Sequence, residues 1–122
     1  MDRAEFENLV IEALESLPEE IAGWLDNIDI VIEWSPSREQ IRNLGLRPSE
    51  TLFGLYEGVP LTARTTSYGQ VLPDRITIFQ KSILDHCRTP QQIRAQVRRT
   101  VIHEIAHHFG ISDGRLRELG AY

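Results

Sequence analysis

The chain has 122 residues, enough for a modest hydrophobic core, so we expect residues 1–122 to form one domain. Hydrophobic residues make up 41% and charged residues 25%, an ordinary globular composition, and no run approaches the ~20 apolar residues of a membrane span. The net charge of -5 argues against a nucleic-acid partner. The single cysteine, Cys87, excludes an intrachain disulfide and fits a reducing, cytoplasmic location.

The N-terminal part of the chain predicts helical segments followed by a strand. Residues 3–17 place apolar side chains at the helical period, and Pro18 ends this pattern. Residues 19–25 add a helical turn at most, because a glycine interrupts them. In residues 28–34 (IDIVIEW) isoleucines alternate with other residues, which predicts a strand with one buried face.

Two more strands are predicted in the middle of the chain. Ser37 is placed to cap a short turn that runs to Leu44, and residues 51–58 (TLFGLYEG) have the aromatic and branched residues of a strand. Residues 59–73 contain prolines and glycine and predict a long loop. The third strand is RITIFQ (75–80). It is either an edge strand, to which an extended peptide could add by β-augmentation, or an ordinary strand with no exposed edge.

A second long helix has clear start and stop signals. Thr89 is placed as the N-cap, Pro90 as the first helical residue and Gln92 as the capping-box partner, and Gly110 ends the helix. Apolar residues lie around much of its circumference, so we expect it to be central to the core. A short tail helix is predicted at residues 115–119. The apolar residues of the long helix are Ile93, Ala95, Val97, Val101, Ile102, Ile105, Ala106 and Phe109.

The stretch HEIAHHFGISD has the spacing of a metal site with a general base. An α-helix turns about 100° per residue, so His103 and His107 project from one face, one turn apart, and can bind one zinc ion. Glu104 lies beside that face, where a carboxylate can take a proton from a metal-activated water. Gly110 permits a turn that brings Asp113 back as a third ligand and leaves a fourth position open.

These residues resemble the signature HExxHxxGxxD of zincin metallopeptidases that use aspartate as the third ligand. GLYEGVPLT, VLPDRITIFQ and HEIAHHFGISD together resemble the small bacterial family of minimal zincin-like metallopeptidases, over residues 5–122. The resemblance implies an α+β minimal zincin-like fold, with a small sheet of about three strands packed against an N-terminal helix and a central active-site helix. It also implies His103, His107 and Asp113 as ligands of one zinc ion per chain and Glu104 as general base, with no particular substrate.

Each site residue has a structural alternative. His103, Glu104 and His107 could form a solvated helix face, and Asp113 could cap the tail helix, since Ser-Asp-Gly is a capping and turn sequence. His108 points about 100° away from His107. We therefore expect His108 at the surface or behind the ligands rather than on the metal.

One three-residue segment and two tyrosines carry polar or reactive groups without a ligand pattern. Asp85-His86-Cys87 is interpreted as loop polarity with a partly buried thiol, because adjacent residues do not easily chelate one ion together. Tyr68 could stabilise an oxyanion or simply pack over its loop. Tyr122 could close the site from below, where many larger zincins carry a methionine turn that has no counterpart in this chain.

The sequence therefore predicts a zinc-dependent metallopeptidase that acts on a peptide or protein substrate, without a membrane partner, and a homodimer is compatible with so small a domain. A metal-dependent ribonuclease is one alternative, because six arginines lie in the last third of the chain, although the net charge makes nucleic acid a poor partner. A catalytically silent zinc- or peptide-binding module is another, because a short chain leaves few residues for a substrate cleft. The six arginines are Arg88, Arg94, Arg98, Arg99, Arg115 and Arg117.

Overall fold

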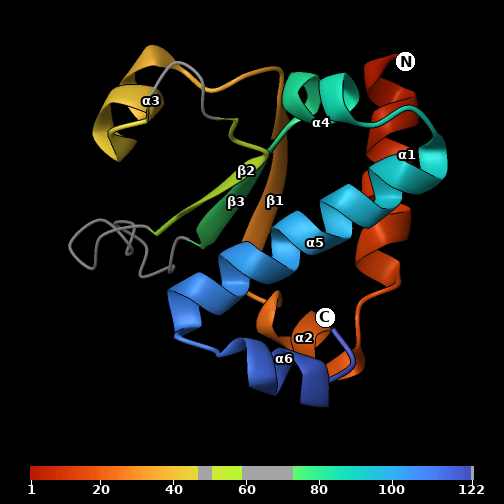
Figure 1. The fold of residues 1–122 in the computed structure, drawn as a ribbon, viewed down its shortest axis with the longest axis vertical. Coiled ribbons are helices and arrows are strands. Elements are labelled where there is room, and N and C mark those ends of the chain that lie inside the picture. The colour runs from red at the N-terminus through yellow and green to blue at the C-terminus, as the bar shows by residue number, and fades with distance from the viewer. Residues whose placement is uncertain (47–50, 59–72, 122) are drawn as a thin grey trace, which may run out of the picture.

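The computed structural model describes residues 1–46, 51–58 and 73–121, so the loop expected at residues 59–73 lies almost wholly outside it. Within the described ranges the chain forms six helices and one three-stranded sheet (Figure 1). The α+β class and the small sheet of three strands are thereby confirmed. The elements are α1 (Arg3–Glu15), α2 (Glu19–Trp24), β1 (Ile28–Glu33), α3 (Arg38–Leu44), β2 (Gly54–Glu57), β3 (Asp74–Phe79), α4 (Gln80–His86), α5 (Pro90–Phe109) and α6 (Asp113–Glu118).

The central strand of the sheet is β3, because the strand order is β1-β3-β2. β1 runs parallel to β3, with Ile28 opposite Asp74, and β2 runs antiparallel to β3, with Gly54 opposite Ile78. Both sides of β3 are paired, so the interpretation of RITIFQ as an edge strand is wrong and the ordinary-strand interpretation is confirmed. The edges of the described sheet belong to β1 and β2.

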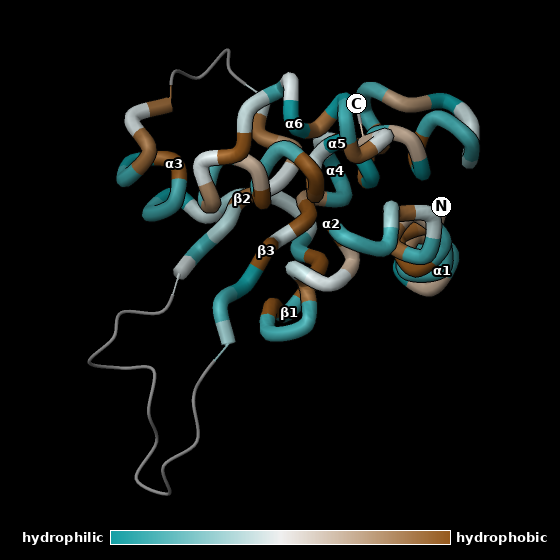
Figure 2. Tube along the Cα trace, turned by 90° about the horizontal axis from the view of Figure 1, so that it is seen from below, coloured by the Kyte–Doolittle hydropathy of each residue, from teal (hydrophilic) through white to brown (hydrophobic). Residues whose placement is uncertain are grey.

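The core lies where α1 and α5 meet the sheet. α5 crosses in front of the strands in Figure 1, and both views place the sheet between α3 on one side and α1 on the other (Figures 1 and 2). Phe6 of α1 and Ile76 and Ile78 of β3 are fully buried. The central position expected for the long helix is confirmed. Its buried residues are Ile93, Val97, Thr100, Val101, Ile102, Ile105 and Ala106.

Phe109 departs from the expected core pattern, because 51% of its surface is exposed. It is the last residue of α5, and its ring packs against Trp24 and His108, with ring centroids 6.5 Å and 5.0 Å away. The apolar recurrence of α5 thus continues one turn beyond the buried part of the helix. No helix in the described part of the chain is long and apolar enough to cross a bilayer.

The predicted N-cap at Thr89 and the predicted stop at Gly110 are confirmed, but the capping box expected at Gln92 is wrong. The Gln92 N–H donates to Thr89 Oγ1 (3.1 Å), and Gly110 adopts the left-handed conformation, with φ of 67°. The Gln92 side chain accepts from the Arg88 N–H (2.7 Å) instead of returning to the cap residue. Ser37 caps α3 in a complete capping box, so the short turn expected there is a regular helix.

The sequence does not predict α4. It places Gln80 in a strand and residues 85–87 in a loop, but Gln80, Asp85 and His86 are helical, so these assignments are wrong. β3 runs directly into α4, and Phe79 at the cap position makes no side-chain cap hydrogen bond. A tertiary contact stabilises the start of the helix instead, because the Lys81 N–H donates to the Trp34 carbonyl (2.9 Å). The start of α4 has no capping residue that the sequence could show, which is why the sequence does not predict this helix.

Gly54 marks a close approach of β2 to α5. A Cβ atom at this position would lie 2.5 Å from Thr100 Cγ2 and 3.0 Å from the Thr77 carbonyl oxygen. We expect Gly54→Ala to lower the free energy of unfolding by about 1–3 kcal/mol, because the added methyl group overpacks a closed contact. Urea denaturation of the variant and the wild type measures this difference.

A matched second change identifies the obstacle. Thr100→Ser deletes Cγ2 and keeps the hydroxyl group, which accepts a hydrogen bond from Gln96 (3.1 Å). Gly54→Ala should therefore cost less in the Thr100→Ser background than in the wild-type chain. An equal cost in both backgrounds would contradict the proposed clash with the threonine methyl group.

Candidate metal centre and active site

Helix α5 holds the two candidate histidine ligands on its exposed side. Ile102, Ile105 and Ala106 are buried against the core, and this fixes the rotation of the helix about its axis. His103 and His107 are both exposed and stand one turn apart. The expectation that the two imidazoles project from one face of a helix is confirmed, while their binding of a metal stays a prediction.

Glu104 lies half-buried between α5 and the edge of the sheet. Its carboxylate accepts a hydrogen bond from the backbone N–H of Tyr56 in β2. Desolvation by burial raises the pKa of Glu104, and the nearby His107 and the Tyr56 hydrogen bond offset part of this rise. The carboxyl group is thus held in place by a strand and made more basic by its surroundings.

The pairing of β2 with β3 explains why the Tyr56 N–H points toward α5. The Phe79 N–H donates to the Phe53 carbonyl (2.9 Å), so the backbone groups of Phe53 face β3. Backbone groups alternate in direction along an antiparallel strand, so those of Gly54 and Tyr56 face the open edge. This is why the Tyr56 N–H is available to Glu104 rather than to the neighbouring strand.

A groove of about 440 Å³ lies between the chain at residues 51–54 and α5. Residues 51–54 form its strand side, and Arg99, His103 and Glu104 contribute to its helix side. The candidate general base therefore borders a cleft large enough for a short stretch of another chain. Gly54, the first residue of β2, brings the open edge of this strand to the cleft.

Asp113 stands in the first turn of α6 and is exposed. Ser112, not Asp113, caps this helix, because Ser112 Oγ accepts from the Arg115 N–H (3.1 Å). The turn that the sequence predicts at Gly110 is present, and the Ile111 N–H closes it on the Ala106 carbonyl (2.8 Å). The alternative in which Asp113 is the N-cap of the tail helix is therefore wrong, because its neighbour Ser112 is the cap.

His108 joins the motif helix to two strands. It stacks on Tyr56, with ring centroids 3.9 Å apart and 14° between the ring planes. Tyr56 Oη donates to Asp74 Oδ2 (2.5 Å), and His108 Nε2 lies 3.8 Å from the same oxygen. The sequence did not single out Tyr56 or Asp74, although an aspartate at the start of an apolar strand is a signal for a buried polar contact, and Asp74 is only 7% exposed.

The candidates of residues 85–87 make contacts within or near α4. Asp85 pairs with Lys81 (2.6 Å), and His86 Nδ1 lies 2.9 Å from the Ser82 carbonyl oxygen. Desolvation by burial raises the pKa of the Cys87 thiol, which is partly buried as expected. These contacts favour the structural interpretation of the three residues. Two other candidates, Tyr68 and Tyr122, lie outside the described residues.

A family model for zincin-like metallopeptidases matches residues 25–121. The chain belongs to this family. The match runs from β1 to α6 and so includes the sheet, Glu104 and both histidines of the motif. Zinc binding is a general property of zincins, and the donor chemistry here fits it, because imidazole nitrogens one helical turn apart are ligands that zinc prefers.

The zincin-like fold of this chain is also similar to a solved structure, that of a conserved hypothetical protein from T. thermophilus. The TM-score is 0.56 and the sequence identity 24%, with 93% of this chain and 99% of that chain covered. A likeness at this identity shows the fold alone. No curated protein matches the chain at a significant level.

The described residues do not gather a complete set of metal ligands. Among them, no three histidine, cysteine, aspartate or glutamate side chains form a group that could hold a metal ion. The structure thus keeps His103 and His107 on one face with Glu104 beside them, but it does not bring Asp113 to them. The role of Asp113 as third ligand stays a prediction.

The buried setting of Glu104 makes the stability of the metal-free protein depend on pH. Its pKa is higher in the folded state, so its contribution to stability is largest below the unfolded pKa and is lost as pH rises through the folded pKa. Glu104→Gln, measured with a chelator present, should therefore gain stability relative to the wild type as the pH rises from about 4, near the unfolded pKa, through the raised folded pKa. Urea titrations across this range measure the trend.

Glu39→Gln is a control for the loss of one negative charge, since it replaces an exposed carboxylate on α3 with the same amide. The gain expected of Glu104→Gln should exceed that of Glu39→Gln. A stability difference for Glu104→Gln that does not change with pH would contradict the effect of burial.

Proposed function

We propose that this zincin-like protein is a zinc-dependent peptidase in which Glu104 is the general base. One observation carries the proposal: Glu104 lies on α5 directly after one candidate ligand, borders a groove, and is held by a backbone N–H of the edge strand. Membership in the metallopeptidase family supports the same activity.

The proposed ligands are His103, His107 and Asp113, which would hold one zinc ion per chain. The left-handed Gly110 allows the chain to turn after α5, and Asp113 follows this turn at the start of α6. Zinc, when bound, polarises a carbonyl group and lowers the pKa of a water molecule. The three side chains together would leave a coordination position open, as a catalytic site requires.

Glu104 moves the proton in the proposed reaction. Its carboxylate accepts a proton from water as the water oxygen bonds to the scissile carbonyl carbon, and it returns that proton to the amine nitrogen as the C–N bond breaks. Burial raises the pKa of Glu104, which makes the carboxylate a stronger base than an exposed one. The hydrogen bond from Tyr56 limits the directions in which this carboxylate can turn.

We expect the substrate to be an extended segment of a peptide or protein that lies along β2. Backbone groups of Gly54 face the open edge, and the groove beside this edge reaches Glu104. Addition of a strand at an open edge supplies main-chain hydrogen bonds that do not depend on the substrate's side chains. The peptide-binding role first considered for RITIFQ is thus proposed for β2 instead, because central β3 has no open edge.

Ion pairs weaken the basis of the ribonuclease alternative. Arg94 pairs with Glu12 (3.1 Å), and Arg115 pairs with Glu20 (3.4 Å) and Glu118 (3.1 Å). Part of the positive charge that the sequence concentrates near the motif is therefore neutralised within the chain. A phosphodiester backbone would require a continuous basic face.

Metal content tests the proposed ligands directly. We expect about one zinc ion per chain in the purified wild type, and its loss in His107→Ala and in Asp113→Ala, because removal of one of three ligands typically abolishes tight binding. Mass spectrometry of the three proteins measures the zinc. His86→Ala should keep its zinc, since it removes a histidine of α4 that lies outside the proposed site.

Two results would change the assignment. Zinc that is lost in His107→Ala but kept in Asp113→Ala would give the third ligand to another residue. A wild-type chain that takes up no zinc from an excess of the metal would end the peptidase proposal and favour a silent peptide-binding module.

The general base is tested by turnover. Glu104→Gln should keep its zinc and lose about a hundred- to ten-thousand-fold in the rate of hydrolysis of a fluorogenic peptide library, because an amide cannot accept the proton. The comparison is made at equal zinc content. Equal rates in the two proteins would remove Glu104 from the reaction.

A further inference from the structure

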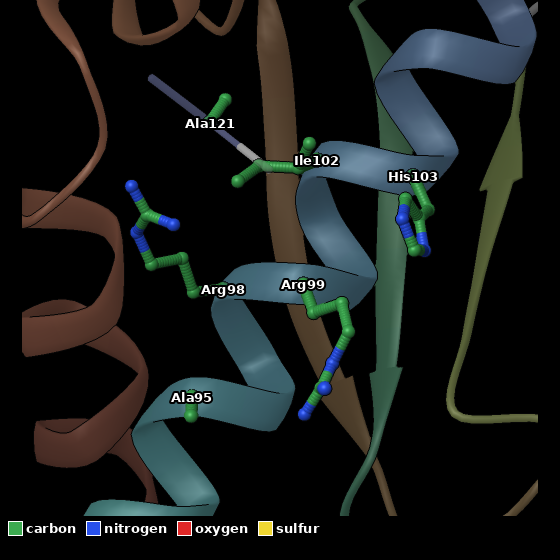
Figure 3. Close-up of a pocket in the computed structure, with 6 residues that line it drawn as sticks. All are labelled: Ala95, Arg98, Arg99, Ile102, His103 and Ala121. Carbon is green, nitrogen blue, oxygen red and sulfur yellow. The ribbon is translucent and has the colours of Figure 1, made fainter. Parts of the chain in front are cut away.

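A second cavity lies on the exposed face of α5, next to His103. Its volume is about 450 Å³. Figure 3 shows the residues that line it on successive turns of the helix, with Ala121 of the C-terminal segment opposite. Two arginines, Arg98 and Arg99, supply the charged groups of its lining.

Neither of these arginines is neutralised by a neighbour in the described structure. Arg99 is exposed and donates to the amide oxygen of Gln96 (3.5 Å), which is a neutral partner, and Arg98 is half-buried without an ion pair there. One turn earlier on the same helix, Arg94 is paired with Glu12. The chain carries a net charge of -5, so two guanidinium groups without an ion pair among the described residues are a local concentration of positive charge beside the candidate site.

Arg99 connects this cavity to the groove of the proposed active site. It lines both spaces, and so does His103. Figure 3 shows the two arginine side chains diverging, with Arg98 on the side of Ala121 and Arg99 pointing away from it. Because four helical residues span about 6 Å, the backbone of Arg99 lies about two residues of an extended peptide from that of His103 along the helix.

We propose that Arg99, with Arg98 beside it, binds a carboxylate of the substrate, so that the substrates are peptides with a negative charge close to the bond that is cut. This inference rests on the proposed peptidase function. A guanidinium group binds a carboxylate through two parallel hydrogen bonds, which gives geometric selectivity as well as attraction. The carboxylate is either an acidic side chain or the free C-terminus of the peptide.

Peptide binding to the zinc-loaded Glu104→Gln protein tests the proposal without turnover. The probes are fluorescein-labelled, alanine-rich peptides that carry either glutamate or glutamine at one position, each with a free or an amidated C-terminus. Fluorescence anisotropy should show about tenfold tighter binding of the peptides with the recognised carboxylate. A preference for glutamate within the amidated pair identifies a side-chain site, and a preference for the free acid within the glutamine pair identifies a C-terminal site.

Arg99→Gln, introduced into the same protein, should abolish the preference. Arg94→Gln is the matched control, since it removes the same charge from the same helix at an arginine already paired with Glu12. The preference should survive this change. An equal loss of the carboxylate preference in the two variants would overturn the proposal, because the preference would then depend on net charge alone.

Other outcomes would overturn the subsite as well. These are equal binding of all four peptides, no measurable binding of any acidic peptide, and stronger binding of a single-stranded RNA oligonucleotide than of the acidic peptides. The two proposals fail separately. A carboxylate preference without hydrolysis by the wild type would support the subsite and contradict the peptidase proposal. Hydrolysis without the preference would support the peptidase proposal and contradict the subsite.

Discussion

Helix α5 and the edge strand β2 contact each other through three different kinds of group. Gly54 allows the strand backbone to approach Thr100, the Tyr56 N–H holds the Glu104 carboxylate, and the Tyr56 ring stacks on His108. A general base acts only when its carboxylate is kept within hydrogen-bond reach of the proton that it takes. The packing of this one strand against this one helix therefore sets the position on which the proposed chemistry depends.

Local sequence signals were sufficient where an element is determined by its own residues. Thr89 and Gly110 mark the ends of α5 because capping and the left-handed turn involve neighbouring backbone groups. α4 has no such mark, since a contact from Trp34, far away in the sequence, stabilises its first turn. Strand order is non-local in the same sense, which is why the sequence left open whether RITIFQ lies at an edge.

The candidate site also contains some residues that the sequence could place and others that it could not. His103, Glu104 and His107 could be placed near one another from the sequence, because positions on a single helix are related by a fixed rotation. The contact of Glu104 with Tyr56 joins residues of different elements, so no spacing encodes it. Asp113 is an intermediate case: the turn at Gly110 follows from the glycine, but the direction in which α6 leaves it depends on packing.

Gly54 also has a consequence for how faithfully the sheet assembles. A shift of β2 by one residue would put Phe53 or Leu55 at the place where even a Cβ atom comes within 2.5 Å of Thr100 Cγ2. The same shift would turn the backbone of Tyr56 away from Glu104, because side chains and backbone groups exchange sides with each step along a strand. Misaligned pairings are thus excluded sterically and would also break the hydrogen bond to the carboxylate. Gly54, the smallest residue of β2, therefore fixes the register of this strand.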